Sequence, residues 1–159
     1  MRILVVSDTH GSIDSVVTYI KAHPSTFDSL WHLGDYHKDA IKIGRLTGLQ
    51  LHAVKGNCDL YANVEEDLSL MVHGHRILLT HGHRYGVKHS LLKIYLKANE
   101  GAYDLVCFGH THMATQAREG SVTLFNPGSA SEPRAGSHPS VGIVEIDDTG
   151  IKTTIVLLQ

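Results

Sequence analysis

Short apolar runs that stop at polar side chains recur along the first two thirds of the chain. The first run, Ile3–Val6, is continuously aliphatic, which is typical of a strand buried on both faces, and it stops at Ser7 and Asp8. Similar runs are Ser29–Leu33, which ends at Gly34-Asp35, and Leu49–Lys55, which ends at Gly56-Asn57. Because parallel sheets bind ligands beyond the carboxyl ends of their strands, these polar side chains are expected to converge.

Helical patterns fill the segments between the strands, as right-handed crossovers between parallel strands require. Ser12 is a candidate N-cap for a first helix, whose apolar face consists of Ile13, Val16, Val17 and Ile20. A second, short helix is predicted around Asp39–Leu46. The apolar face of a third consists of Val87, Leu91, Ile94, Tyr95 and Ala98.

Two further strands end at histidines. Leu68–His73 and Arg76–Thr80 flank Gly74-His75 as a hairpin, and the second of them runs into Thr80-His81-Gly82-His83. The apolar run Asp104–Phe108 leads into Gly109-His110-Thr111-His112. Five predicted strands therefore each deliver a polar cluster at their carboxyl end.

The last third of the chain has an antiparallel pattern. Turns at Glu119-Gly120 and Asp147–Gly150 join short alternating strands, of which Lys152–Leu158 is the last. We expect these strands to form a second sheet that packs on the first. The Pro-, Gly- and Ser-rich segment from Asn126 to Ser140 is long enough to predict a functional or mobile loop.

Length and composition exclude several classes of protein. The 159 residues suit one domain over 1–159, and no disulfide is expected between Cys58 and Cys107, which lies in an apolar run. The net charge is −2 and no basic run occurs, so an extended nucleic-acid surface is not expected. The N-terminus does not resemble a signal peptide, and we expect a cytoplasmic protein without a membrane partner. A homo-oligomer stays open.

Thirteen histidines are unusually many and point to metal-ligand clusters. Asp8 with His10, and His110 with His112, are alternate residues of extended segments that could hold one cation together. Either pair alone could equally be a helix cap or a set of satisfied loop side chains. Five clusters at five strand ends are harder to explain in this way. Their carboxylates, imidazoles and amide form a donor set suited to Mn²⁺, Zn²⁺ or iron.

These motifs resemble the signature of the calcineurin-like metallophosphoesterases. The matching segments are Asp8-Thr9-His10-Gly11, Gly34-Asp35, Gly56-Asn57-Cys58-Asp59, Thr80-His81-Gly82-His83 and Gly109-His110-Thr111-His112. The short length and the segment Asn126-Pro127-Gly128-Ser129 are most similar to the YfcE-type branch of small phosphodiesterases. The resemblance spans essentially the whole chain. It implies an α/β fold, a two-sheet αββα sandwich with mixed parallel and antiparallel strands.

The resemblance also implies two divalent metal ions, Mn²⁺ in the first place, with Zn²⁺, Fe²⁺ or Ni²⁺ as alternatives. The implied ligands are Asp8, His10 and His112 for one ion, Asn57, His81 and His110 for the other, and Asp35 as the bridge. A hydroxide between the ions would attack the phosphorus of a small-molecule or nucleotide phosphodiester. Asn57 and Asp35 are the candidate catalytic residues, and Arg134 is a candidate donor to the phosphoryl oxygens.

Position 58 departs from the wider family, in which many members carry a histidine that is thought to protonate the leaving group. A thiol, whose ordinary pKa is about 8.5, is a poor replacement, so we expect Cys58 to pack or to support the site. His37 and His83 are candidate substitutes. Without such an acid, diesters with good leaving groups, such as aryl phosphodiesters, should be cleaved best.

Asp59, the remaining histidines and two competing functions complete the predictions from the sequence. Asp59 either forms a turn or orients the imidazole of His81 or His10. The histidines assigned to surface or structural roles are His23, His32, His52, His73, His75, His89 and His138. The competing function is a protein-interaction scaffold, because the retromer subunit of eukaryotic vacuolar sorting shares the fold, although a scaffold needs no such ligand set. A single structural metal is disfavoured, since the ligands come from scattered strand ends.

Overall fold

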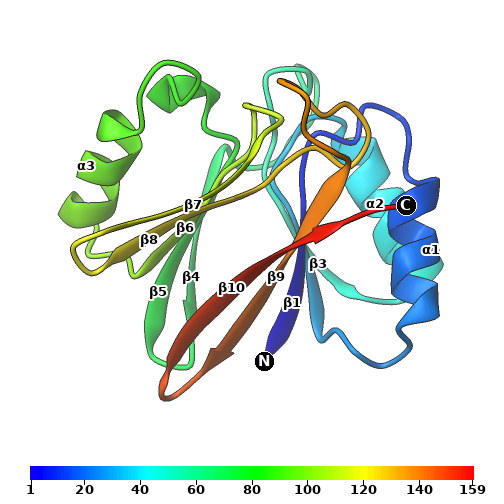
Figure 1. The fold of residues 1–159 in the computed structure, drawn as a ribbon, viewed down its shortest axis with the longest axis horizontal. Coiled ribbons are helices and arrows are strands. Elements are labelled where there is room, and N and C mark those ends of the chain that lie inside the picture. The colour runs from blue at the N-terminus through cyan, green and yellow to red at the C-terminus, as the bar shows by residue number, and fades with distance from the viewer.

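The computed structural model describes residues 1–159 as two five-stranded sheets that pack face to face between outer helices (Figure 1). The first sheet has the strand order β10 (Gly150–Leu157), β9 (Ser140–Asp147), β1 (Arg2–Val6), β2 (Ser29–His32) and β3 (Gln50–Ala53). The second has the order β4 (Asp67–Val72), β5 (His75–Thr80), β6 (Leu105–Cys107), β8 (Val122–Pro127) and β7 (Ala114–Glu119). The helices are α1 (Asp14–Ala22), α2 (His37–Thr47) and α3 (Leu92–Glu100), with a short 3₁₀ turn at His83–Tyr85.

Both sheets mix parallel and antiparallel strands. The strands β1, β2 and β3 are parallel, and β9 and β10 extend that sheet in antiparallel pairing. In the second sheet β5, β6 and β8 are parallel, and the antiparallel strands β4 and β7 form the two edges. The helices α1 and α2 lie on one outside and α3 on the other (Figure 1), which confirms the predicted αββα sandwich.

The last third of the chain does not form a second sheet by itself, and this part of the prediction was wrong. The hairpin β7–β8 joins the second sheet through the pairing of β8 with β6, whereas β9–β10 joins the first through the pairing of β9 with β1. A hairpin pattern reports pairing between neighbours in sequence, but it does not report which distant strand the hairpin joins. The segment between β8 and β9 crosses from one sheet to the other.

Two helix starts also differ from the predicted ones. Ser12 does not cap α1, because the helix begins at Asp14 and its N-cap position is Ile13, where no side-chain cap is present. The third helix is shorter than its apolar pattern indicates, since it begins only at Leu92, where the backbone N–H bonds to the Ser90 hydroxyl. Val87 is buried from the preceding turn, so burial without helical structure produced the misleading periodicity.

Apolar packing holds the four layers together in three clusters. The cluster between the sheets includes Trp31 and Phe125, both fully buried. Leu4 and Ile43 belong to the cluster beneath α1 and α2, and Ile94 belongs to the one beneath α3. Full burial of one such side chain stabilises the fold by roughly 1.5–3 kcal/mol. The sheets are therefore a firm support for the loops at their ends.

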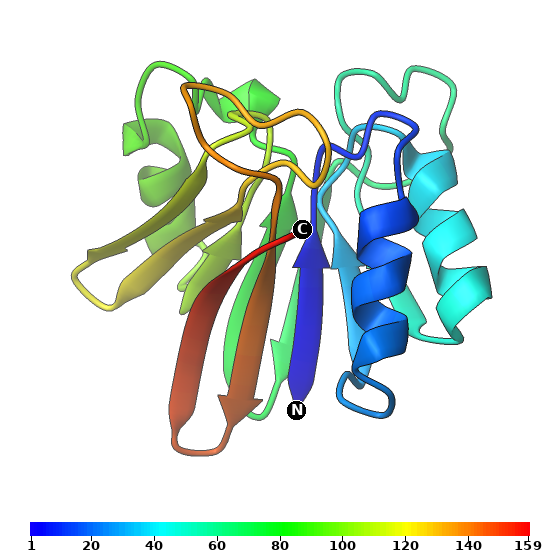
Figure 2. The same cartoon turned by 45° about the vertical axis from the view of Figure 1, so that its right-hand side comes forward.

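The loops that follow β1, β2, β3, β5 and β6 gather at one end of the molecule, opposite the N-terminus and the β9–β10 turn (Figure 1). The turned view shows the same end occupied by these loops and by the long segment between β8 and β9 (Figure 2). The five predicted strand ends thus belong to two sheets, and they meet above the line along which the sheets pack.

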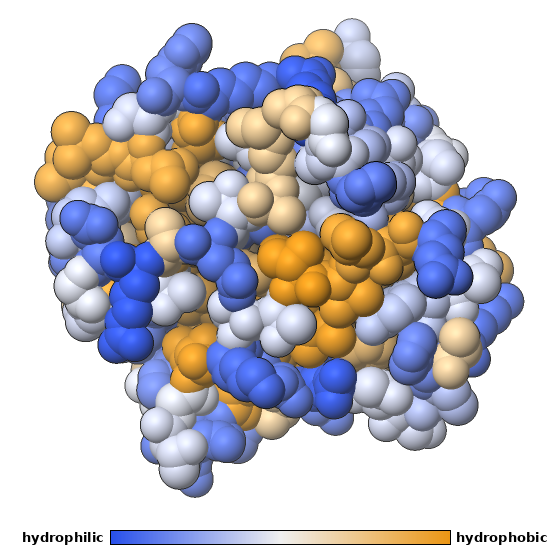
Figure 3. Space-filling model, viewed as in Figure 1, coloured by the Kyte–Doolittle hydropathy of each residue, from blue (hydrophilic) through white to orange (hydrophobic).

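The surface carries apolar side chains in separate areas. On the face seen in Figure 1 these areas are divided by hydrophilic side chains (Figure 3), which is ordinary for a globular protein. No helix has the length and apolar character needed to cross a membrane.

Candidate metal centre

Four side chains from three loops form a first donor group, defined as Asp8, His10, Asp35 and His112. Their ligand atoms all lie within 4.8 Å of one another. The Nε2 atoms of His10 and His112 are 3.3 Å apart, and His112 Nε2 lies 3.2 Å from Asp8 Oδ1. All but His10, which is partly exposed, are buried. Carboxylates and imidazoles that face one another at this spacing could hold a metal ion.

Asp8 has one oxygen held by the protein and one left free. Its Oδ2 accepts hydrogen bonds from the Ser7 hydroxyl (2.6 Å) and from the His110 backbone N–H (3.0 Å). Its Oδ1 is buried without a hydrogen-bond partner and faces the imidazole of His112. Burial would raise the pKa of Asp8, but the adjacent imidazoles of His112 and His81 outweigh it and lower the pKa to about 2. A buried, ionised oxygen without a partner fits a cation ligand.

Backbone carbonyls fix the orientation of two of the imidazoles. His81 Nδ1 lies 2.8 Å from the carbonyl oxygen of Leu33, and His112 Nδ1 lies 2.7 Å from that of Glu132. A carbonyl only accepts, so in each ring Nδ1 carries the proton and Nε2 presents a lone pair to the site. The adjacent carboxylate of Asp8 raises the pKa of His112, whereas burial lowers that of His110 to about 4.

The remaining predicted ligands form a second donor group, defined as Asn57, His81 and His110. His81 Nε2 is 3.1 Å from Asn57 Oδ1 and 3.2 Å from His110 Nδ1. Asp35 lies between the groups, with Oδ1 3.5 Å from His81 Nε2 and Oδ2 3.7 Å from His10 Nε2. The structure thus brings all seven predicted ligands together at one end of the two sheets.

The backbone bends sharply at the ligands. Positive φ angles, unfavourable for residues other than glycine, occur at Asp8 (53°), His10 (43°), Asp35 (58°), His110 (68°) and His112 (61°). Such strain persists only where the surroundings enforce it, and it concentrates at functional sites. Two glycines permit the close approach of the loops. A Cβ atom at Gly56 would lie 2.0 Å from Asp35 Oδ1, and one at Gly109 would lie 2.8 Å from Asp8 Oδ2.

A buried hydrogen-bond chain supports the loop between Asp8 and His10. His32 Nδ1 accepts from the Gly34 N–H, so its Nε2 carries the proton that is shared with Thr9 Oγ1 (3.3 Å). Thr9 in turn donates to Asp39 Oδ2 (2.7 Å), which also accepts from the Gly11 N–H. His32 thus has the structural role predicted for it, whereas the role of Asp39 was not predicted, because nothing in the local pattern connects α2 to this loop.

The Pro-, Gly- and Ser-rich segment holds the site from the other side. The hydroxyl of Ser129 donates to the carbonyl of Asp8 (2.7 Å), and that of Ser131 donates to the carbonyl of Thr9 (2.7 Å). The amide of Asn126 bonds to the Gly109 carbonyl. The length of this loop predicted a role, and the role seen is to brace the ligand loops.

The other candidate residues lie around the centre. Cys58 is exposed, and partial loss of water around its sulfur together with the Asp35 charge raises its pKa to about 11. Asp59 orients neither candidate imidazole, because its oxygens accept from the backbone N–H groups of His37 (2.6 Å) and Gly56 (2.8 Å) and thereby form a turn. The Leu33 carbonyl orients His81 instead.

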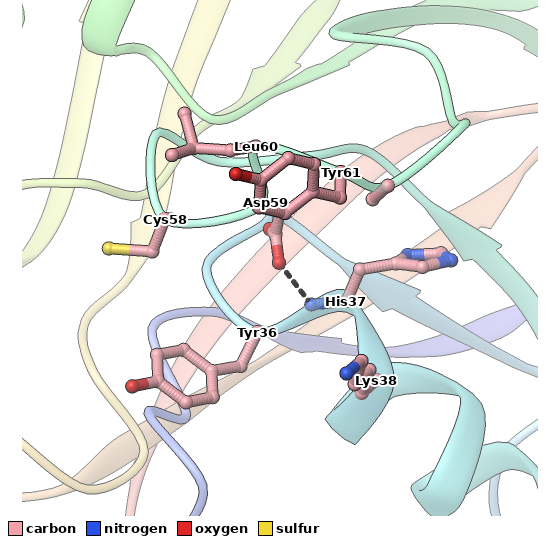
Figure 4. Close-up of a pocket in the computed structure, with 8 residues that line it drawn as sticks. Tyr36, His37, Lys38, Cys58, Asp59, Leu60 and Tyr61 are labelled. Carbon is pink, nitrogen blue, oxygen red and sulfur yellow. Dashed lines mark hydrogen bonds between the residues drawn. The ribbon is translucent and has the colours of Figure 1, made fainter.

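The remaining three candidates differ in their approach to the site. The imidazole of His83 lies beside those of His81 and His110, with ring centroids 5.4 and 6.0 Å apart. The imidazole of His37 points away from Cys58 (Figure 4). Arg134 has an exposed side chain and is tied to the site through its backbone N–H, which donates to the His112 carbonyl. Only His83 therefore stands next to the proposed ligands.

Comparisons with known proteins agree with this geometry. Probable metallophosphoesterase YsnB of Bacillus subtilis is 35% identical over 93% of this chain and 86% of its own length. Phosphodiesterase YfcE of Escherichia coli K12 is 28% identical over 92% of this chain and 89% of its own length. The crystal structure of Vps29 from Entamoeba histolytica, complexed with Zn²⁺, superposes with a TM-score of 0.81, covering 99% of each chain at 22% identity. That likeness concerns the fold alone.

The family model for the calcineurin-like phosphoesterase superfamily domain matches residues 1–149, the range that contains every residue of both donor groups. The resemblance inferred from the motifs is thereby confirmed, including the relationship to small phosphodiesterases of the YfcE type. With its metal-ligand cluster in place at the end of the two sheets, the chain belongs to the calcineurin-like phosphoesterase superfamily.

Proposed function

We propose that the protein is a phosphodiesterase that uses two divalent cations, in the first place Mn²⁺. The observation that carries this proposal is the position of Asp35, whose two oxygens face the two donor groups separately, one toward His81 and the other toward His10. A single ion held by the first donor group would leave the neighbouring Asn57, His81 and His110 without a role. A carboxylate between two sets of imidazoles is suited to bridging a pair of ions.

The ligands divide between the ions as the two donor groups do. In this proposal Asp8, His10 and His112 hold one ion, Asn57, His81 and His110 hold the other, and Asp35 contacts both. Mixed oxygen and nitrogen donors accept Mn²⁺, and also Zn²⁺, Fe²⁺ or Ni²⁺. When bound, such a pair lowers the pKa of coordinated water and offsets charge on phosphoryl oxygens.

The chain itself contributes orientation and one amide donor. Asn57 is exposed, and its Nδ2 is directed to the Cys58 sulfur at 3.5 Å, a weak partner that a phosphoryl oxygen can replace. The Ser7 hydroxyl donates to Asp8 and is fully buried, so it is not accessible to attack phosphorus. Water is therefore the nucleophile in this proposal.

The leaving group has no strong acid beside it at position 58. A thiol donates a proton poorly near neutral pH, and the structure places no imidazole there. We infer a preference for phosphodiesters whose leaving group is a stable anion, such as an aryl oxide. A role as a protein-interaction scaffold, the alternative on the same fold, would not require the unpaired buried oxygen of Asp8.

Hydrolysis of bis(p-nitrophenyl) phosphate tests the proposal. Protein stripped of metal with a chelator should be inactive and should regain activity with Mn²⁺. Asp35→Asn and His81→Ala should each remove the activity, while Met71→Ala, on an exposed position of β4, should keep it. A protein that stays inactive with every divalent metal, or is unaffected by both ligand substitutions, would contradict the proposal.

A further inference from the structure

A pocket of about 460 Å³ adjoins the metal centre. It lies between the beginning of α2 and the loop after Asn57, and it is lined mainly by Tyr36, Lys38, Cys58, Leu60 and Tyr61 (Figure 4). Its size is within the range of small-molecule sites. Its walls carry apolar and aromatic side chains, in contrast to the polar ligands of the neighbouring centre.

Direct contacts join the pocket to the proposed ligands. The ring of Tyr36 packs edge-on against the imidazole of His10, with 5.2 Å between the ring centroids. The backbone N–H of Cys58 donates to Asp35 Oδ1 at 2.9 Å. A phosphoryl group at the metal centre would therefore place one of its ester groups at the mouth of this pocket.

Asp59 holds the two walls of the pocket in place. One of its oxygens accepts from the His37 N–H at the beginning of α2, and the other accepts from the Gly56 N–H at the beginning of the loop. Figure 4 shows this carboxylate between the two walls, with Tyr36 on one side and Leu60 and Tyr61 on the other. The pocket is thus formed before any ligand binds.

Much of the surface of the pocket's aromatic and apolar side chains is left uncovered by the chain itself. Tyr61 is 99% exposed, and Leu60 is 77% exposed. Tyr36 is 43% exposed and has a φ of 71°, a conformation that is a genuine outlier for a bulky residue. Contact with a planar ring would bury these side chains and would offset the strain at Tyr36.

We propose that this pocket binds the aromatic ring of an ester group on the substrate phosphorus, either an aryl group or a nucleobase. The inference rests on the proposed phosphodiesterase function, because the metal centre must hold the phosphoryl group while the ring enters the pocket. Tyr36 and Tyr61 provide faces for stacking, and Leu60 provides apolar contact. Stacking is tolerant of ring identity, since every such ring has a π face.

Binding of phosphonates that cannot be hydrolysed tests this pocket without requiring turnover. Calorimetry on the Mn²⁺-loaded protein would compare benzylphosphonate, an analogue of phenyl phosphate, with ethylphosphonate, which carries a methyl group in place of the ring. We expect benzylphosphonate to bind about tenfold more tightly, as one good stacking contact provides. Thymidine 5′-monophosphate and ribose 5′-phosphate form a second pair, and a larger preference there identifies a nucleobase as the occupant.

Substitutions in the pocket test whether it is the source of the preference for benzylphosphonate over ethylphosphonate. Tyr61→Ala and Tyr36→Gly should reduce the benzyl preference toward one, and Tyr61→Phe, which keeps the ring, should retain it. Leu92→Ala removes an exposed apolar side chain from α3, outside the pocket, and should leave the preference unchanged. Tyr61 has almost no contacts to lose, so its substitutions should leave the fold intact.

Three results would overturn the inference. Equal metal-dependent binding of both phosphonates would show that no ring is recognised, although the proposed phosphodiesterase function would stand. A benzyl preference that survives in Tyr61→Ala and Tyr36→Gly would place the ring elsewhere. If neither phosphonate bound in a metal-dependent manner while bis(p-nitrophenyl) phosphate was still hydrolysed, the inference alone would fail; if that hydrolysis were absent as well, the proposed function would fail with it.

Discussion

The two donor groups differ in how firmly the protein holds them. In the first, Asp8, Asp35 and His112 are buried, and the loop between Asp8 and His10 is fixed by the His32–Thr9–Asp39 chain and by two serine hydroxyls. In the second, Asn57 is exposed, and its side chain contacts only His81 and the Cys58 sulfur. A site fixed by its surroundings binds an ion with less reorganisation. The first group should therefore be the tighter metal site.

The largest effect is expected from Asp8→Asn, which removes the charge from the firmer group. The amide can keep the hydrogen bonds from Ser7 and His110 and donate to His112, so the metal-free fold should be as stable as before or more stable. We expect Mn²⁺ to lose its stabilising effect in thermal unfolding, and kcat/KM to fall at least about a thousandfold. Asp148→Asn, at an exposed carboxylate, is the control. Retained activity would show that the firm group is not the essential one.

A second prediction concerns the support behind the first group. Burial lowers the pKa of His32 from 6.5 to about 4. Between about pH 6.5 and pH 4, His32 is protonated in the unfolded chain but not in the folded chain. Its contribution to the free energy of unfolding is therefore fully present above about pH 6.5 and declines as the pH falls toward 4. At about pH 4 the free energy of unfolding is lower by roughly 3 kcal/mol for this reason. Urea unfolding of metal-free protein at several pH values measures it.

His32→Gln is the matched variant for this prediction, because glutamine can bond to Thr9 but does not titrate in this range. It should be less stable than the native protein near neutral pH, and its stability should decline less between pH 6.5 and 4. The difference between the two curves isolates His32 from other groups such as His110, whose pKa is also lowered. Parallel curves would mean that the buried chain does not constrain the loop as described.

The third prediction separates the two groups directly. Asn57→Ala should weaken binding of the second Mn²⁺ ion about 10- to 100-fold, because one neutral and exposed ligand is lost, while the first ion binds as before. Calorimetric titration of metal-free protein would resolve the two events. Asn63→Ala, at an exposed asparagine farther along the same loop, should change neither affinity. Equal weakening of both ions would contradict the division into a firm and a loose group.

The difference between the two donor groups also explains which parts of the site could be predicted from the sequence. Asp8, Asp35, Asn57, His81 and His110 were found because each follows an apolar run, and a run of that kind is a local signal. The supports of the first group were not found, since Asp39 and Ser129 reach the loop from segments 31 and 121 residues away from Asp8 in sequence. Their contacts depend on how the chain crosses between sheets, which hairpin patterns do not encode.

The strand pairings have the same limitation. The sequence pattern predicted the strand β9 and its turn to β10. It did not predict that β9 pairs with β1, where Val144 lies opposite Ile3 from near the other end of the chain. Similarly, the exposed position of Cys58 and the turn made by Asp59 follow from the close approach of Gly56 to Asp35. Local composition predicted which residues carry chemistry, and tertiary contacts decided which of them are held rigidly.

The smallest predicted effect tests the boundary between the groups, where Cys58 lies beside Asn57 and donates its backbone N–H to Asp35. Cys58→His would introduce a proton donor next to the looser group. On p-nitrophenyl esters, whose leaving group needs little protonation, turnover should change by no more than about twofold. On alkyl or unsubstituted phenyl esters it should rise about tenfold. The dependence of kcat on leaving-group pKa should therefore become shallower.

Cys58→Asn, which is polar but cannot act as an acid in this pH range, is the control and should keep the native slope. If both variants gave the same slope, the missing acid at position 58 would not be what limits this site, and His83, beside His81 and His110, would be the next residue to test.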